Sequence, residues 1–284
     1  ASRRPFYDFE DGAEAAVPHG RYLWNDALGH HVTFRNYGEF VTAGASKPTP
    51  VGSMDRGLLT HTDRNYATFD MSVEDVARFE EWKREFDVYE KNGTLPQLEI
   101  VRFPRDHTAG TRAGQVTPQG MVADNDLAVG KLVEAISHSP DWKSSAIFVV
   151  EDDAQNGPDH VDEQRSTFYL ASPYAAGGVQ HAAYTQASVL RTMEILLNLP
   201  PMSAYDAGAP PLSAAFTATA NVAPFDAVPA KYDVHTKNGA TAYRAADSAK
   251  MRFDVADAVD PAELNDILWH AVKGPHAPPP HDTR

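Results

Sequence analysis

The most informative group of potential metal ligands lies in residues 149–161. An apolar, β-branched run that ends at Val150 predicts a buried strand, and the acids Glu151, Asp152 and Asp153 follow it directly. Ligands of α/β proteins bind beyond the carboxyl ends of the strands. Adjacent carboxylates repel one another unless a cation or water screens their charge. The pattern therefore predicts a metal-binding loop at the end of a central strand, with a solvated acidic loop as the equally open alternative.

The geometry of such a loop depends on how the backbone turns. Neighbouring strand residues point to opposite faces, so Asp152 and Asp153 share one cation only if the strand has already ended. The sequence Asn-Gly-Pro at 156–158 favours a turn there. Carboxylate oxygens suit Mg, Mn or Ca, whereas an added histidine, for which His160 is the candidate, shifts the preference towards Zn, Mn or Fe. His160 taken alone is more often an ordinary turn residue.

A second candidate pair, Asp106 and His107, follows a predicted strand over 98–103. In a parallel sheet this loop opens at the same edge as the loop that contains Asp152. A histidine there could bind a metal, hold a phosphoryl oxygen or protonate a leaving group. A surface histidine in a turn is the simpler explanation of the pair alone, but two such loops together favour a shared site.

The elements that must position these residues alternate along the chain. The patterns predict helices near 22–28, 72–91, 118–136, 187–199 and 261–272, and strands at 32–37, 98–103, 146–150 and 167–171. Ser72 with Asp75 resembles a capping box at the start of the second helix. Alternating strands and helices favour an α/β fold, with a mainly parallel sheet and helices on both faces.

The chain divides by composition into three parts. Residues 1–204 carry the alternating pattern and predict the α/β domain, with a turn-rich excursion between 40 and 70. Residues 205–274 are rich in Ala, Pro and Asp, and they predict an extended arm whose late helix packs on the domain. Residues 275–284 form a Pro- and His-rich tail, for which we expect flexibility.

Composition excludes several classes of function. The formal net charge of −14 opposes binding to nucleic acid or to anionic membranes. The chain contains no cysteine, which rules out zinc–thiolate sites and disulfides and is weakly consistent with a periplasmic or secreted protein. No apolar run reaches membrane-spanning length, and no signal peptide occurs in these 284 residues.

Six ordered segments together resemble bacterial phosphoesterases of the alkaline phosphatase superfamily, in the branch that includes phospholipases C and acid phosphatases. The resemblance extends over nearly the whole chain. The segments are residues 35–40, 106–111, 122–128, 150–161, 172–174 and 188–196, and 264–269 resembles the far C-terminus of the type often fused behind a β-propeller.

The resemblance implies a three-layer α/β sandwich and a metal-dependent phosphoric ester hydrolase. Asp152 and Asp153 match the paired metal ligands, whose ion is Zn, Mn, Ca or Mg. His107, with Asp106, matches a loop that supplies either a metal ligand or a phosphate-binding, proton-donating histidine, and His160 matches the Asp-His that follows the acidic pair. A small phosphate ester or a phospholipid head group is the implied substrate.

One difference between this sequence and the family pattern affects the expected activity. In the family, the nucleophile and the first metal ligands lie upstream of the segment that resembles residues 3–9. We therefore expect this chain to be the C-terminal part of the domain, incomplete without an upstream N-terminal segment. Gln164 also stands where close relatives would have histidine. Two other possibilities stay open, namely a non-catalytic structural or binding fragment of the same protein and an acidic calcium-binding module.

Overall fold

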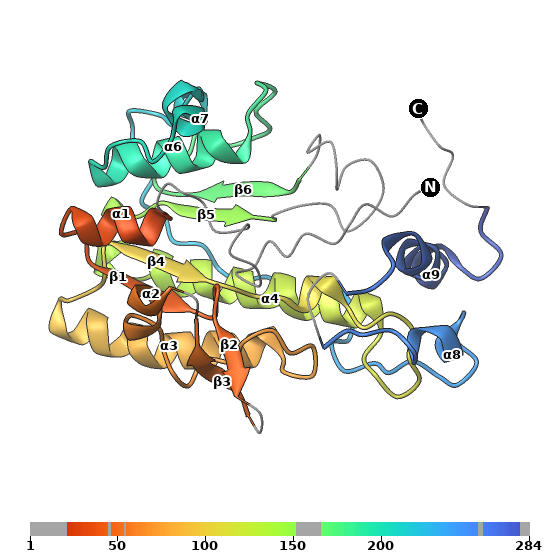
Figure 1. Ribbon diagram of the computed structural model, residues 1–284. Helices are drawn as coiled ribbons and strands as arrows, with labels where there is room; N and C mark the ends of the chain where they lie inside the picture. The colour runs from red at the N-terminus through yellow and green to blue at the C-terminus, as the bar shows by residue number, and fades with distance from the viewer. Residues whose placement is uncertain (1–21, 45–46, 54, 152–165, 255–257, 279–284) are drawn as a thin grey trace. The chain divides into compact units, whose positions relative to one another are not determined.

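The computed structural model describes residues 22–44, 47–53, 55–151, 166–254 and 258–278 (Figure 1). Asp152, Asp153 and His160 lie outside these residues. The described residues form a mixed α/β structure that includes a small parallel sheet.

The predicted helices and strands occur in the expected order along the chain, with further short elements between them. The strands are β1 (Phe34–Tyr37), β2 (Thr42–Gly44), β3 (Lys47–Gly52), β4 (Leu98–Val101), β5 (Ile147–Val150) and β6 (Phe168–Ala171). The α-helices are α1 (Leu23–Gly29), α2 (Arg56–Thr60), α3 (Asp75–Asn92), α4 (Pro118–Ser137), α6 (Gln186–Leu197), α7 (Ala204–Gly208), α8 (Ala245–Ser248) and α9 (Pro261–Lys273). Short 3-10 turns are η2 (Arg105–His107), η3 (Pro140–Ser144) and η4 (Ser213–Ala215).

The chain divides into two compact units, and one boundary falls within α3, between Lys83 and Arg84. The first unit contains Ala1–Thr68, Arg84–Arg102 and Tyr174–Thr219, and the second contains Phe69–Lys83, Phe103–Pro173 and Ala220–Arg284. The division of the chain at 204 and 274 that the sequence suggests stays a prediction.

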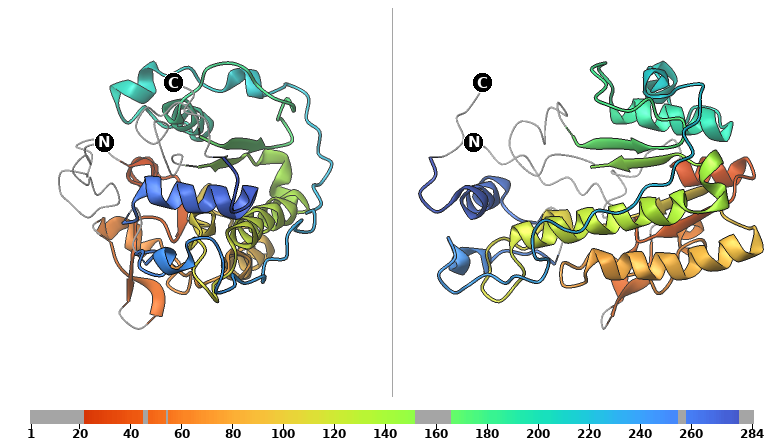
Figure 2. Two further views of the ribbon diagram at one scale, coloured as in Figure 1. Left: turned by 90° about the vertical axis from the view of Figure 1, so that its right-hand side faces the viewer. Right: turned by 180° about the vertical axis from the view of Figure 1, so that it is seen from behind.

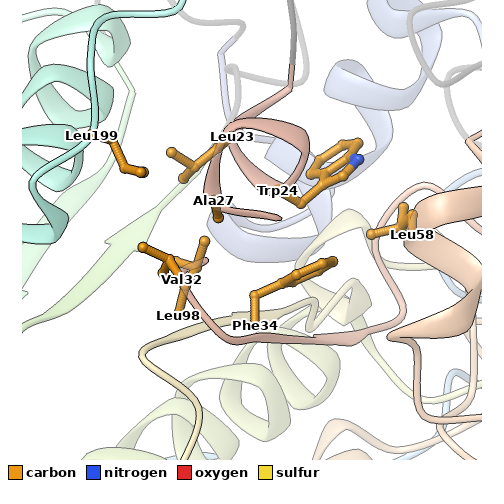
Figure 3. Packing of buried hydrophobic residues seen from close by; sticks show 8 residues of the cluster. All are labelled: Leu23, Trp24, Ala27, Val32, Phe34, Leu58, Leu98 and Leu199. Atoms are coloured by element: carbon orange, nitrogen blue, oxygen red, sulfur yellow. The ribbon is translucent and has the colours of Figure 1, made fainter. Parts of the chain in front are cut away.

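The first unit is built on the parallel pair of β1 and β4, in which Phe34 lies opposite Leu98. Its apolar core brings α1 onto this pair, with Trp24 and Phe34 both almost fully buried (Figure 3). Leu199, just after α6, belongs to the same cluster. The amphipathic pattern of α1 thus explains why the chain packs back onto its first strand.

The second unit contains α4, the turn η2, the β5–β6 pair and α9. Helix α9 lies across α4 in both views of Figure 2, and Nε2 of Gln119 donates to the backbone oxygen of Ala271 at 2.7 Å. Leu264 and Ile267 give α9 its buried face. The late helix predicted from residues 261–272 is therefore confirmed, and it packs within this unit.

The pairing of β5 corrects one expectation. Strands β5 and β6 are antiparallel, with Val150 opposite Phe168, so the prediction of parallel pairing is wrong for these two strands. The prediction of a buried strand is also wrong, because β5 is half-buried and Val150 is exposed. Two strands that are consecutive in the chain and adjacent in a sheet can pair directly when they are antiparallel, whereas parallel strands need a crossover connection. Among the described strands, only β1 and β4 pair in parallel, so a three-layer sandwich remains a proposal.

Two further segments differ from the expected pattern. The excursion between 40 and 70 contains the antiparallel pair β2–β3 and the short helix α2. Helix α3 begins at Asp75, and the hydroxyl of Ser72 donates to Asp70 instead of capping the helix. No helix in the described part of the chain is long and apolar enough to cross a membrane.

Candidate functional site around His107

The turn η2 carries the first candidate pair, Asp106 and His107, directly after β4. The backbone N–H of His107 donates to the oxygen of Pro104 at 3.2 Å and closes the turn. Both side chains are half-buried. The ring of Phe69 meets the His107 imidazole edge-on, with 5.1 Å between the ring centroids. An apolar contact therefore orients a histidine that is still partly open to solvent.

Thr108, the next residue, has an unusual backbone conformation. Its φ is +60° and its ψ is 177°, a region that β-branched residues rarely occupy and that costs about 1–3 kcal/mol. The residue is buried, its N–H donates to the oxygen of Arg105 at 3.1 Å, and its Oγ1 accepts from Gly110. Such strain persists only where neighbours fix the backbone, so the turn must be held by contacts on both sides.

On the N-terminal side, the turn is fixed by a buried ion pair. Nη1 of Arg105 donates to Oδ2 of Asp124 at 2.8 Å, and the side chains are 2% and 0% exposed. The backbone N–H of Arg105 donates to Oδ2 of Asp75 at 2.9 Å. Because unpaired charges in an apolar interior are costly, these partners define one position for the turn.

The same carboxylates also join α3 to α4. Asp124 accepts from the backbone N–H of Asp75 at 2.6 Å, which caps the first turn of α3. Asp75 pairs with the buried guanidinium of Arg78 at 2.9 Å and accepts from Asn125 at 3.1 Å. Burial raises the pKa of Asp75 to about 6, against the lowering effect of Arg78.

On the C-terminal side, the loop after the turn is tied to α8. The N–H of Thr111 donates to Oγ of Ser248 at 3.1 Å, and its hydroxyl donates to the oxygen of Tyr243 at 2.6 Å. The side-chain amide of Asn238 donates to the oxygens of Gly110 and Val116, both at 3.2 Å. The backbone that carries His107 is thus held at both ends by buried polar contacts.

This arrangement defines what the turn can do chemically. An imidazole offers a metal ligand, a hydrogen bond to an oxyanion or a proton donor, and a carboxylate offers hard oxygen ligands. Asp106 and His107 present both groups on a backbone that is held at both ends. The charges of Asp75, Arg105 and Asp124 are used in internal pairing, so these residues position the turn.

The described residues do not test the predicted convergence of the two loops. Asp106 and His107 share the turn η2, whereas Asp152, Asp153 and His160 lie outside the described residues. The shared site therefore stays a prediction. Among the described residues, the ligand groups that gather in a trio are Glu134, His138 and Asp226, which sequence reasoning did not single out.

The buried network was also missed from the sequence. Asp124 lies in the first turns of α4, where an acid favours the positive end of its own helix, but its carboxylate caps α3. One signal was available, because Met121, Asp124 and Ala128 have the spacing of one helix face and both apolar residues are buried. An acid on an apolar face indicates a buried partner. For Arg105 and Arg78 the sequence offered no comparable signal.

Comparison with known proteins adds no identification. No protein-family model matches this chain, and no curated protein matches it significantly.

Proposed function

We propose that this chain supplies metal ligands and a phosphate-contacting histidine to a metal-dependent phosphoric ester hydrolase. The ordered set of motifs that resembles the alkaline phosphatase superfamily motivates the proposal. The observation that carries it is the turn η2, where His107 stands half-exposed on a backbone locked by buried ion pairs and by the strained Thr108. Strained, over-determined backbone is common at active sites.

Each candidate residue has a role in this proposal. Asp152 and Asp153, with Asp106 and His160 as further ligands, would hold the divalent ion. Carboxylate and imidazole donors fit Zn or Mn, and the bound ion would polarise a phosphoryl oxygen. His107 would donate a hydrogen bond to a phosphoryl oxygen or protonate the leaving group. The substrate would be a small phosphate ester or a phospholipid head group, and the setting periplasmic or secreted.

The proposal of a nucleophile rests only on the resemblance to the alkaline phosphatase superfamily. No residue of this chain matches it, so we infer that a separate, upstream segment of the same protein provides it. Correct placement of a reacting group accounts for about 7–11 kcal/mol of barrier lowering. We therefore expect residues 1–284 alone to hydrolyse phosphate esters poorly or not at all.

A second candidate function is a non-catalytic, structural fragment of the same protein. The observation that favours it is the internal use of charge around η2, where Asp75, Arg105 and Asp124 bind one another in a buried network. A polar network of this kind can stabilise a fold without any chemistry.

Hydrolysis and binding assays separate the two functions. Mn²⁺ and Zn²⁺ binding to residues 1–284 is measured by calorimetry, and p-nitrophenyl phosphate and its diester are assayed with and without the upstream segment. We expect Asp152→Ala or Asp153→Ala to remove one metal equivalent and all restored turnover. Unchanged metal binding in both variants contradicts the proposed ligands, and metal-dependent turnover by residues 1–284 alone contradicts the separate nucleophile.

A further inference from the structure

A second group of potential ligands lies at the C-terminal end of α4, in the second unit. Glu134 and His138 are four residues apart on the helix, so both project from one face. Asp226, far along the chain, meets them there, and the three ligand atoms all lie within 4.8 Å of one another. Nε2 of His138 and Oδ1 of Asp226 are 3.0 Å apart.

The backbone around Asp226 is fixed to α4 independently of this contact. The hydroxyl of Ser137 donates to the oxygen of Phe225 at 3.2 Å and accepts from its N–H at 2.9 Å. The N–H of Ala227 donates to Oε1 of Glu134 at 3.1 Å. Asp226 is therefore held over the helix from both sides, which lowers the entropic cost of using its carboxylate as a ligand.

The donor set selects the class of cation. We propose that Glu134, His138 and Asp226 form a zinc site that clamps residues 225–227 to the end of α4. Imidazole nitrogen and carboxylate oxygen are both zinc ligands, and the trio supplies the three protein ligands that an open zinc site needs, with water in the fourth position. Calcium prefers six to eight oxygen ligands and would gain little from the histidine.

The geometry needs only small adjustments. Ligands about 2.0–2.2 Å from a tetrahedral zinc ion lie within about 3.5 Å of one another. His138 and Asp226 are exposed, so their side chains can close that distance, and the ion replaces their mutual hydrogen bond. A carboxylate has two oxygens, so Glu134 can ligate the ion while it accepts from Ala227. Two negative charges against one dication make the site neutral.

A surface pair elsewhere in the same unit provides a matched control. Nδ1 of His235 lies 3.1 Å from Oε1 of Glu74; His235 is exposed and Glu74 is half-buried. Within the described residues this pair has no third ligand group close enough to complete a trio. It should therefore not bind zinc with comparable affinity.

The test is calorimetric titration of residues 1–284 with Zn²⁺, compared with the variants His138→Gln, Asp226→Asn and His235→Gln. We expect the first two to lose one zinc equivalent or to weaken its binding by at least about 10- to 100-fold, the cost of losing even an outer-shell partner. His235→Gln should bind as the parent does. All of these side chains are exposed, so the variants should fold.

The outcome does not depend on the proposed hydrolase site. Asp152→Ala should remove a different equivalent from the one that His138→Gln removes. Equal zinc binding in the parent, His138→Gln and Asp226→Asn would overturn the proposed clamp. An equal loss in His235→Gln would also overturn it, because it would indicate unspecific binding to surface histidines.

Discussion

The carboxylate of Asp124 on α4 and the guanidinium of Arg105 on η2 form an ion pair of 2.8 Å that is almost fully buried. The same carboxylate caps α3 through the backbone N–H of Asp75. One side chain therefore fixes the position of a helix start and of the turn that carries His107. Its removal should affect stability and the candidate site together.

We expect Asp124→Ala to lower the free energy of unfolding by about 3–5 kcal/mol, because it leaves a buried guanidinium without its partner. Asp126→Ala is the matched control. It removes an exposed acid from the same helix and should change stability by less than about 0.5 kcal/mol. Urea denaturation followed by circular dichroism measures both values. Equal stability of the two variants would contradict the importance of the buried pair.

Two glycines with the same backbone conformation should respond differently to alanine. Gly110 and Gly93 have φ values of +57° and +62°. A Cβ at Gly110 would lie 2.7 Å from Oγ of Ser248, which Thr111 already engages, whereas Gly93 has open space.

Gly93→Ala should therefore cost about 1–2 kcal/mol, the price of the left-handed conformation alone. Gly110→Ala should cost about 1–3 kcal/mol more, because it adds overpacking. Thermal unfolding of both variants tests the difference. Equal melting temperatures would mean that the loop around Gly110 can move away from α8.

The buried carboxyl pair of Glu194 and Asp206, in the first unit, should make stability depend on pH. The N–H of Met202 donates to both carboxyl groups, at 3.1 Å to Glu194 and 2.6 Å to Asp206. Burial, with the neighbouring Asp206, raises the pKa of Glu194 from 4.5 to about 7. Hydrogen bonds from Glu194 and Ser203 lower the pKa of Asp206 to about 2, against the opposing effect of burial.

The direction in which the free energy of unfolding changes with pH follows from the number of protons bound in each state. Between pH 4.5 and 7 the folded protein keeps a proton on Glu194 that the unfolded chain releases, so the free energy of unfolding falls as the pH rises. Between pH 5 and 7 the parent should lose about 2–3 kcal/mol more than Glu194→Gln, at about 1.4 kcal/mol per pKa unit. Denaturation at both pH values measures this, with the exposed Glu80→Gln as control. Parallel pH profiles of parent and Glu194→Gln would exclude a shared proton.

A kinetic measurement tests the proposed role of His107 on the turn η2. In a form of the protein that hydrolyses p-nitrophenyl phosphate, His107→Gln should lower kcat by about 10²- to 10⁴-fold, the usual contribution of a proton-transferring side chain. His181→Gln, which changes an exposed histidine, should leave kcat unchanged. Full activity of the His107 variant would remove His107 from the proposed mechanism.

The sequence predicted the positions of helices and strands better than it predicted which residues and strands contact them. Pro118 and the apolar spacing after it placed α4 to within a residue of its observed end, because both signals are local. The cap of α3 was missed because its acceptor, Asp124, lies 49 residues away. The antiparallel direction of β5 and β6 was missed for the same reason, since strand direction depends on the path between strands. Asp106 and His107 could be singled out because they follow a predicted strand, and their role stays a prediction.

The antiparallel pairing of β5 and β6 has a practical consequence for protein engineering. The N–H of Glu151 donates to the oxygen of Thr167 at 3.0 Å, so the chain leaves and re-enters the described structure at adjoining points. An exchange of residues 152–166, which contain three of the candidate ligands, for a two-residue hairpin turn would keep Glu151 opposite Thr167. Metal binding and unfolding of that variant, compared with the parent, would measure the two contributions of the exchanged residues separately.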